Sequence, residues 1–244
     1  MKLTVLGNNG PFPGAGGACS GYLVQEGDIN LLLDCGNGVL GNLQKRISLN
    51  MLDAVILSHL HSDHMSDLMV LRYAVQIGMK RGMTDRLVDV YAPAEPSEEY
   101  GRLDIKDAFV LRPLTDGLML DFGPMKLAFA VMTHPVKSFA ASVEAGGKRF
   151  VYSGDTSWNE NIVKFCGNAD LILLDAGLKS SDKTGGNAVH LTARECGEIA
   201  KECGAKKLVI THFWPGYDVK ELLCEAKEIF GNVEAAEILK TYEI

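Results

Sequence analysis

Three histidines and an aspartate lie within six residues of one another in the segment His59-Leu-His61-Ser-Asp63-His64. The apolar run at residues 54–57 comes directly before them and predicts a buried strand. Imidazole nitrogens are ligands for zinc, iron and nickel, and a carboxylate adds negative charge. Alternate residues of an extended segment face the same way, so His59 and His61 can share one metal ion. Asp63 and His64 lie further along and can serve a second ion. Because half of the chain's six histidines are here, the segment indicates a metal site.

The other three histidines are His134, His190 and His212, and two of them also follow predicted strands. His134 comes after the strand predicted at residues 125–132, and His212 comes after the strand at residues 207–210. A lone buried histidine is usually structural. Because histidines follow the ends of several strands here, the pattern instead predicts that His134 and His212 are metal ligands.

Three aspartates also end predicted strands. Asp155 follows the strand at residues 149–153, and its two oxygens could each bind one metal ion; the alternative is a turn aspartate. Asp34 and Asp175 are expected to accept hydrogen bonds from the second nitrogen of metal-bound histidines. The alternative for both is an acid on the surface or in a turn.

Short strands and helices follow one another along the whole chain. We predict strands at residues 2–6, 22–25, 30–33, 54–57, 87–91, 109–111, 118–120, 125–132, 139–144, 149–153, 170–174, 207–210 and 233–238. We predict helices at residues 38–47, 65–79, 97–109 and 159–166, a helix capped by Thr192 that ends at Cys203, and a helix at 219–230. In the helix at 65–79, Leu68, Leu71, Tyr73 and Val75 are expected to face inward. Similar strand-rich blocks and helix–strand units occur in both halves, which fits an α/β class αββα four-layer sandwich in one domain spanning residues 1–244.

Two loops lack any periodic pattern. Residues 7–21 contain six glycines, which predicts either a close approach of the backbone to a ligand or a simple wide turn. No Gly-Lys-Ser/Thr sequence ends this loop, so it is not a P-loop. Residues 179–189 form a polar loop.

The composition narrows the classes of partner. A net charge of −7 argues against a dedicated nucleic-acid binder, and we expect no DNA-binding module, although a nuclease with local basic residues stays open. The six cysteines show no Cys-x-x-Cys spacing, and no targeting segment is visible, so a cytoplasmic protein with reduced thiols is expected. No run approaches the roughly 20 apolar residues that span a bilayer, so no membrane association is expected. A homodimer stays open.

The motif His-x-His-x-Asp-His after a strand resembles the signature of the metallo-β-lactamase superfamily of metallo-hydrolases, and His134, Asp155 and His212 match it in order and context. The resemblance implies the αββα fold and two divalent metal ions about 3.5–4 Å apart. Zinc is favoured, and manganese or iron are alternatives. By this resemblance, one ion is held by His59, His61 and His134, the other is held by Asp63, His64 and His212, and Asp155 bridges the two.

Within the superfamily the chain looks most like ribonuclease Z and its short relatives. The likeness lies in Val151-Tyr-Ser-Gly-Asp155-Thr, His190-Leu-Thr-Ala-Arg-Glu and Lys207-Leu-Val-Ile-Thr-His212-Phe. In ribonuclease Z a histidine in the position of His190 is thought to contact the scissile phosphate; the alternative is a neighbour of a helix cap. Asp63 and His190 are the predicted catalytic residues.

Two departures from ribonuclease Z bear on the substrate. The first motif continues as Met65-Ser66-Asp67-Leu68, where ribonuclease Z usually has a Gly-Leu pair. Ribonuclease Z also carries a long tRNA-gripping arm between the third ligand and the bridging aspartate. The stretch from His134 to Asp155 has room only for a hairpin. Both departures argue against tRNA maturation more than against a phosphodiesterase core.

The resemblance implies hydrolysis of RNA or a small phosphodiester by a hydroxide formed between the two metal ions. One rival is a lactonase or thioester hydrolase of the same fold, which needs an apolar or carboxylate-reading pocket. Another is a metal-binding redox or sensor protein with iron. Flavodiiron relatives of that kind carry an additional flavodoxin domain, which does not fit in 244 residues.

Overall fold

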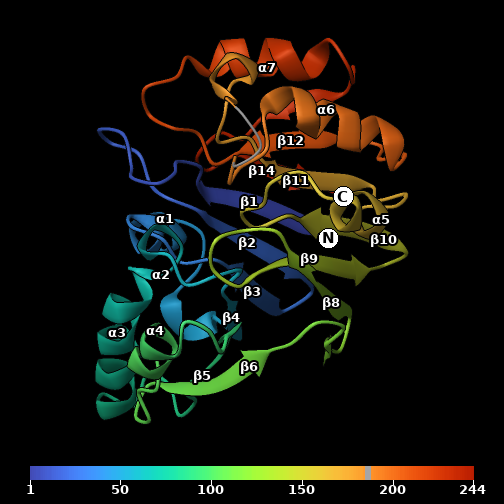
Figure 1. Ribbon diagram of the computed structural model, residues 1–244. Coiled ribbons are helices and arrows are strands. Elements are labelled where there is room, and N and C mark those ends of the chain that lie inside the picture. The colour runs from blue at the N-terminus through green and yellow to red at the C-terminus, as the bar shows by residue number, and fades with distance from the viewer. Residues whose placement is uncertain (185–187) are drawn as a thin grey trace.

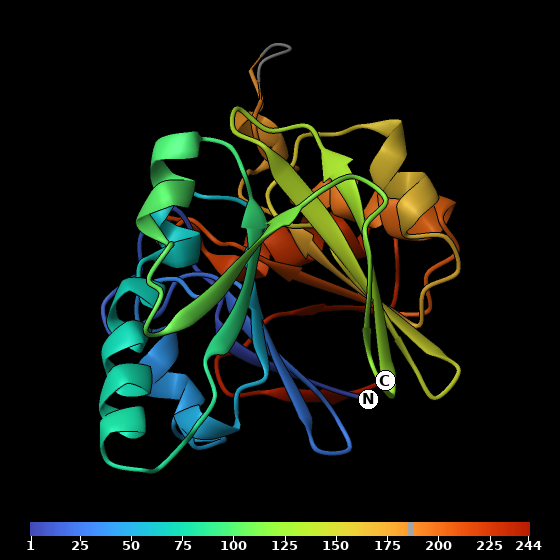
Figure 2. The same cartoon turned by 90° about the horizontal axis from the view of Figure 1, so that it is seen from below.

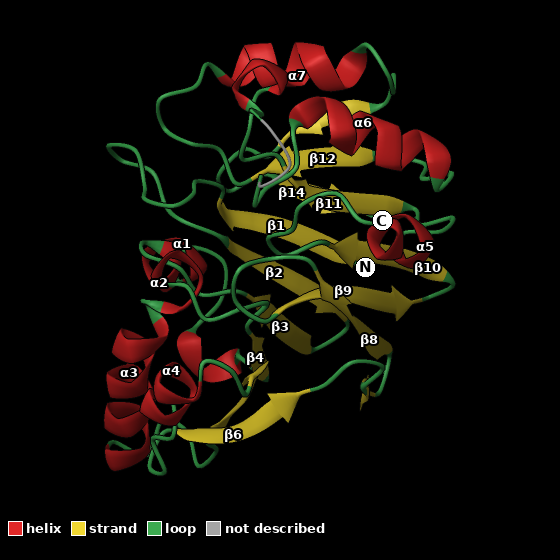
Figure 3. Ribbon diagram, viewed as in Figure 1, coloured by secondary structure: helices red, strands yellow, loops and turns green. Residues whose placement is uncertain are grey.

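A computed structural model describes residues 1–184 and 188–244 of the chain (Figure 1). The segment 185–187, which belongs to the predicted polar loop at 179–189, lies outside the described residues. Two seven-stranded sheets form the centre of the molecule, and the helices lie outside them (Figure 3). This arrangement confirms the predicted αββα sandwich.

The first sheet has the strand order β14-β1-β2-β3-β4-β5-β6. Its strands are β1 (Lys2–Gly7), β2 (Gly21–Glu26), β3 (Ile29–Leu33), β4 (Ala54–Ile56), β5 (Val88–Pro93), β6 (Phe109–Leu114) and β14 (Thr241–Glu243). Strand β14 was not predicted, and it pairs antiparallel with β1, which brings the two termini side by side (Figure 2). The amide of Ile244 donates to the carbonyl of Met1 at 3.0 Å.

The second sheet has the order β13-β12-β11-β10-β9-β8-β7. Its strands are β7 (Met119–Phe122), β8 (Met125–Met132), β9 (Ser138–Ala145), β10 (Lys148–Tyr152), β11 (Leu171–Asp175), β12 (Leu208–Thr211) and β13 (Val233–Ala235). Strands β10 to β13 are parallel, and β8 to β10 form antiparallel pairs. Strand β8 therefore runs in the same direction as β10, β11 and β12, and all four end at one edge of the sheet.

Helices cover the outer face of each sheet (Figures 1 and 3). The first sheet is covered by α1 (Val39–Leu43), α2 (Ser62–Met65), α3 (Leu68–Lys80) and α4 (Ser97–Arg102), with a 3-10 turn at Leu49–Met51. The second is covered by α5 (Glu160–Phe165), α6 (Ala193–Glu202) and α7 (Val219–Lys227), with a 3-10 turn at Ser180–Asp182. No helix in the part of the chain that the structure describes is both long and apolar enough to cross a membrane.

Strand β4 shows how the core is divided. Ala54 and Ile56 pack into the cluster between the two sheets, whereas Val55 and Leu57 pack beneath α1 and α3. Side chains of a strand alternate between its two faces, and a strand covered on both faces must be apolar throughout. The continuous apolar run before His59 is therefore the signature of a strand buried between two layers.

Several predicted boundaries were wrong. The helix predicted at 38–47 ends at Leu43, and the one predicted at 97–109 ends at Arg102, after which residues 103–108 lead into β6. Tyr73 was expected to face inward but is 50% exposed, because a residue two positions from Leu71 and from Val75 lies on the opposite side of α3. All six cysteines are free thiols, as predicted.

Candidate metal centre

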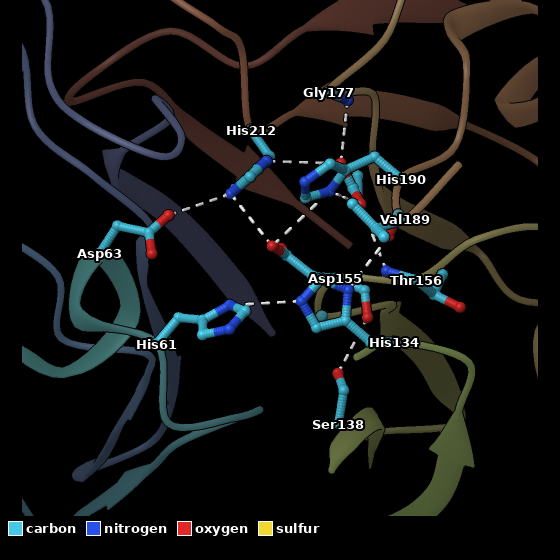
Figure 4. A network of polar contacts seen from close by, with 12 residues as sticks. His61, Asp63, His134, Ser138, Asp155, Thr156, Gly177, Val189, His190 and His212 are labelled. Atoms are coloured by element: carbon cyan, nitrogen blue, oxygen red, sulfur yellow. Dashed lines mark hydrogen bonds and ion pairs between the residues drawn. The ribbon is translucent and has the colours of Figure 1, made fainter. Parts of the chain in front are cut away.

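Strand ends from both sheets converge on one site. In the first sheet the parallel strands β3 and β4 end near Asp34 and His59. In the second sheet, β8, β10, β11 and β12 end near His134, Asp155, Asp175 and His212, respectively. Figure 4 shows side chains from both sheets directed toward one another. Pairing of the strands thus gathers residues that lie up to 178 positions apart between Asp34 and His212.

One group of three imidazoles comes from the first motif and from the end of β8. His59 Nε2 lies 3.0 Å from His61 Nδ1, and His134 Nε2 lies 3.3 Å from the same His61 nitrogen. One nitrogen from each ring falls within 4.8 Å of the others, a spacing suited to a shared metal ion. The extended backbone at His61 lets His59 and His61 reach the same point, as the alternation of residues requires.

A second group consists of Asp63, His64 and His212. The short helix α2 places Asp63 and His64 next to each other, and His64 Nε2 lies 3.4 Å from Asp63 Oδ2. His212 Nε2 lies 3.3 Å from both His64 Nε2 and Asp63 Oδ2. His212 has a φ of 62°, in the left-handed region that non-glycine residues seldom adopt. Such strain is common at functional sites, where the surrounding structure maintains it.

Asp155 lies between the two groups. Its Oδ2 is 3.8 Å from His59 Nε2 in the first group and 3.2 Å from His212 Nε2 in the second. Its Oδ1 is 3.3 Å from His64 Nε2 and, among the described residues, has no hydrogen-bond partner although it is buried. A buried charged oxygen without a partner is costly. A cation on each side of Asp155 would satisfy both oxygens, so the residues present fit a pair of metal ions.

Asp34 fixes the orientation of His64 through a hydrogen bond to Nδ1, the ring nitrogen that faces away from the second group. Its carboxylate accepts hydrogen bonds from His64 Nδ1 at 2.8 Å, from Tyr152 Oη at 2.7 Å, and from the backbone N–H and hydroxyl of Ser58 at 2.7 and 2.8 Å. A histidine that donates from Nδ1 presents Nε2 to a metal. Sequence reasoning singled out Asp34 but missed Tyr152 and Ser58, because no local pattern shows which carboxylate a buried hydroxyl reaches.

Asp175 contacts two histidines. Its Oδ2 lies 2.9 Å from His190 Nδ1, and its Oδ1 lies 3.4 Å from His212 Nδ1. The backbone amides of Gly177 and Thr156 also donate to this carboxylate, at 2.9 and 3.2 Å. His190 lies just before α6, whose start is fixed by a capping box between Thr192 and Glu195. Asp175 therefore orients His190, and its other oxygen lies beside Nδ1 of His212, which has no hydrogen-bond partner among the described residues.

The histidines of the two groups differ in the direction in which their pKa values are shifted. Burial lowers the pKa of His59, His61 and His134 below their ordinary value of 6.5. These three rings are neutral at neutral pH, and their nitrogens can bind a metal ion without first losing a proton.

The histidines of the second group behave in the opposite way. Burial alone would lower the pKa of His64 and His212, but nearby carboxylates outweigh it. Asp155 and Asp34 raise the pKa of His64 well above its ordinary value, and Asp155, Asp175 and Asp63 raise that of His212 to about 10. Without metal, both rings hold a proton at neutral pH and balance the buried carboxylates.

We therefore expect metal binding to release protons from the second group. Both pKa values lie above 6.5, so the protons are present at neutral pH and are lost only as the pH rises. A metal ion must displace them, and its affinity should rise with pH. Calorimetric titration of metal-free protein with zinc, in two buffers of different ionisation enthalpy, should show release of about two protons per chain from these histidines, in addition to any proton released by a metal-bound water. Release of none would show that His64 and His212 are neutral before metal binds.

The glycine-rich loop at residues 7–21 covers His212. A Cβ placed on Gly10 would lie 2.0 Å from His212 Nε2, so the backbone passes directly over this ring. The amide of Gly10 donates to the carbonyl of Phe213 at 3.1 Å, which ties the loop to the strand end that carries His212. The loop therefore passes directly beside the candidate site, which is compatible with the interpretation that its backbone approaches a ligand.

Gly10→Ala should push His212 out of place and weaken metal binding at the second group. We expect a roughly 10- to 100-fold loss of affinity, the range seen when support for a metal ligand is removed. The matched control is Gly14→Ala in the same loop, because a Cβ there meets Pro215 at an ordinary 3.6 Å. Metal affinity measured by competition with a chelator checks this, and equal affinities for both variants would contradict it.

Comparison with known proteins identifies the family. Residues 29–213 match the model of the β-lactamase superfamily domain. The chain belongs to the β-lactamase superfamily. Its fold and its relatives are those of the superfamily's metallo-hydrolases, which confirms the family that the motif predicted.

Relatives within the superfamily align over nearly their whole length. A probable metallo-hydrolase of Bacillus subtilis, YhfI, is 37% identical and covers 97% of each chain. A ribonuclease Z of Archaeoglobus fulgidus is 26% identical over 100% of this chain and 98% of its own. The crystal structure of YhfI superposes with a TM-score of 0.95 at 35% identity, over 100% of this chain and 99% of that one. The short form of human tRNase Z gives 0.79 at 22% identity, over 100% and 99%, and shares the fold.

Proposed function

We propose that this protein is a dinuclear metal-dependent phosphodiesterase, with zinc as the favoured metal and RNA or small phosphodiesters as substrates. The observation that carries the proposal is the position of Asp155. Its carboxylate oxygens lie within 3.8 Å of His59 Nε2 in the first group and of His64 Nε2 and His212 Nε2 in the second. His59, His61 and His134 would hold one ion and Asp63, His64 and His212 the other. When bound, such a pair lowers the pKa of a water and takes up charge on a phosphate oxygen.

His190 is the proposed proton donor to the leaving group. Burial lowers its pKa, but the carboxylate of Asp175 at 2.9 Å outweighs burial and raises the pKa above 6.5. A raised pKa favours the protonated ring, and the contact with Asp175 holds that ring in one orientation. Its side chain is 19% exposed, whereas that of Asp155 is 3% exposed, so His190 is accessible to a substrate from solvent. These are the properties required of a general acid.

In the proposed reaction, the oxygen of a water forms a new bond to phosphorus as the bond from phosphorus to the leaving alkoxide breaks. His190 gives its proton to that alkoxide, the proton lost by the attacking water passes to solvent, and His190 takes up a proton from solvent after the products leave. Asp175 keeps the imidazole oriented and stabilises its protonated form. Asp34, with Tyr152 and Ser58, keeps His64 directed into the site. Each role follows from a contact that is already formed in the folded chain.

The short connection between His134 and Asp155 bears on the size of the substrate. It consists of β9, a two-residue turn at Gly146 and Gly147, β10 and their flanking residues. This leaves no tRNA-gripping arm in that connection, and the net charge of −7 offers little general attraction for a polyanion. Small phosphodiesters therefore fit the site better than precursor tRNA.

A substrate panel tests the proposed function. We expect metal-loaded protein to hydrolyse cyclic dinucleotides, short RNA and bis(p-nitrophenyl) phosphate, to process precursor tRNA weakly, and to leave a homoserine lactone intact. A His190→Ala variant run in parallel separates catalysis from contaminating nucleases. Lactone hydrolysis without phosphodiester hydrolysis would replace this proposal with a lactonase. Efficient, salt-sensitive processing of precursor tRNA would overturn the preference for small substrates.

A further inference from the structure

Two large aromatic side chains are exposed on the segments that surround His212. Phe12 is 52% exposed in the glycine-rich loop, and Trp214 is 43% exposed two residues after His212. An exposed tryptophan leaves a large apolar surface in water, and tryptophan is a residue that binding sites often use. Neither residue was singled out as a site residue from the sequence.

Hydrogen bonds join the glycine-rich loop to the segment after His212. Phe213 N donates to the carbonyl of Asn8 at 2.8 Å, and the side-chain amide of Asn9 donates to the carbonyl of Phe213 at 3.3 Å. Gly10 lies against the ring of His212, and a Cβ on Gly14 would touch Pro215. Residues 9–14 therefore run alongside residues 213–215 and form one wall beside the second ligand group. In Figure 1 the blue loop and the orange loop before α7 extend from the same side of the molecule, above α1 and α2.

The indole of Trp214 is held in place although it is exposed. Tyr217 meets it edge to face, with ring centroids 4.9 Å apart and planes at 87°. Gly216 lies against its six-membered ring, where a Cβ would come within 2.7 Å. Tyr217 is fixed in turn, because its hydroxyl donates to Asp182. An aromatic surface that is exposed but already ordered loses little conformational entropy when it binds a planar group.

We propose that Phe12 and Trp214 form a stacking subsite for the nucleobase of a nucleoside whose phosphodiester lies at Asp155. This inference rests on the proposed phosphodiesterase function and narrows its substrates to nucleotide esters. Bases stack on aromatic side chains without a requirement for sequence, because every base has a π face. The wall that carries both aromatic residues adjoins His212, so a base held there stays close to the ligand groups while its phosphate lies between them.

Two esters with the same leaving group test this subsite. Thymidine 5′-(p-nitrophenyl phosphate) retains a nucleoside after cleavage, whereas methyl p-nitrophenyl phosphate retains only a methyl group. We expect Trp214→Ala and Phe12→Ala each to lower kcat/KM for the thymidine ester roughly 5- to 150-fold, the range for loss of one base stack, and to change the methyl ester less than about twofold. Trp214→Phe should recover part of the loss, because it retains a ring.

Controls separate this subsite from the proposed function and from the fold. Tyr73→Ala removes a 50% exposed aromatic side chain from α3 and should leave kcat/KM unchanged for both esters. Metal content should be the same in every variant. Equal losses on both esters, or no loss on either, would overturn the stacking subsite while phosphodiesterase activity stands. If wild-type protein cleaves neither ester, the proposed function fails, and the subsite fails with it.

Discussion

Asp155→Ala is expected to strip metal from both ligand groups and to reduce turnover to background. Asp155 is the one proposed ligand common to the two groups, with contacts of 3.8 Å to His59 on one side and 3.2 Å to His212 on the other. Its removal also leaves His64 and His212 without the carboxylate that contributes most to raising their pKa values. The second group would then lose both a ligand and the charge balance of its histidines.

Metal content measured by elemental analysis, alongside His134→Ala, checks this expectation. His134→Ala removes a ligand from the first group alone and should retain more metal than Asp155→Ala. Asp155→Asn, which keeps the shape but not the charge, should lie between wild type and Asp155→Ala. Equal and small losses in Asp155→Ala and His134→Ala would show that Asp155 is a turn residue and not a bridge.

His190→Ala is expected to leave both metal ions bound and to cut turnover roughly 10²- to 10⁴-fold, the range for a lost general acid. His190 contacts Asp175 at 2.9 Å, whereas its distance to Asp155 is 3.7 Å, so the ring lies beside the ligand groups. The loss should shrink for esters of p-nitrophenol, because p-nitrophenolate leaves without being protonated. Rates on alkyl and p-nitrophenyl phosphodiesters, measured with the same preparations, give this comparison.

Metal analysis of the same His190→Ala preparation distinguishes the other roles open to this residue. Loss of one metal ion would make His190 a ligand, which its position next to Asp155, Asp175 and His212 could support. A loss of turnover that is equal for good and poor leaving groups would assign it to phosphate binding instead of proton transfer. Unchanged metal and unchanged rate would leave it a purely structural neighbour of α6.

The sequence could predict residues that the fold brings together, because most of them follow the ends of strands. Apolar runs that stop at His59, at Asp155 or at His212 predict strands, and parallel strands bring such ends to one edge. Strands β8, β10, β11 and β12 run in one direction within one sheet, so their ends bring His134, Asp155, Asp175 and His212 to the same edge. Local pattern and global fold agree at these positions, which is why the motif carried so much information.

Local sequence patterns could not predict features that depend on contacts between residues far apart in the sequence. Strand β14 is a three-residue strand, and only its pairing with β1 makes it one. The error at Tyr73 is of another kind, because a residue two positions from Leu71 and from Val75 falls on the opposite side of a helix, and the spacing itself predicts an exposed side chain. The contact between Tyr152 and Asp34 joins residues 118 positions apart.

The glycine-rich loop shows the same limit. Its composition was compatible with either a wide turn or close approach to a ligand, and the choice depends on where His212 lies. The fold places that ring under Gly10, 202 positions away in the chain. A pattern that permits two conformations is resolved only by the tertiary neighbour that the loop meets.

The most direct test of the proposed dinuclear phosphodiesterase function is a metal titration in which activity is measured alongside bound metal. Chelator-stripped protein is titrated with zinc, and bound metal and the rate of bis(p-nitrophenyl) phosphate hydrolysis are measured at each point. We predict that hydrolysis rises with bound metal and that both saturate together at about two ions per chain. Saturation of bound metal at one ion per chain, or two bound ions without hydrolysis, would contradict the account.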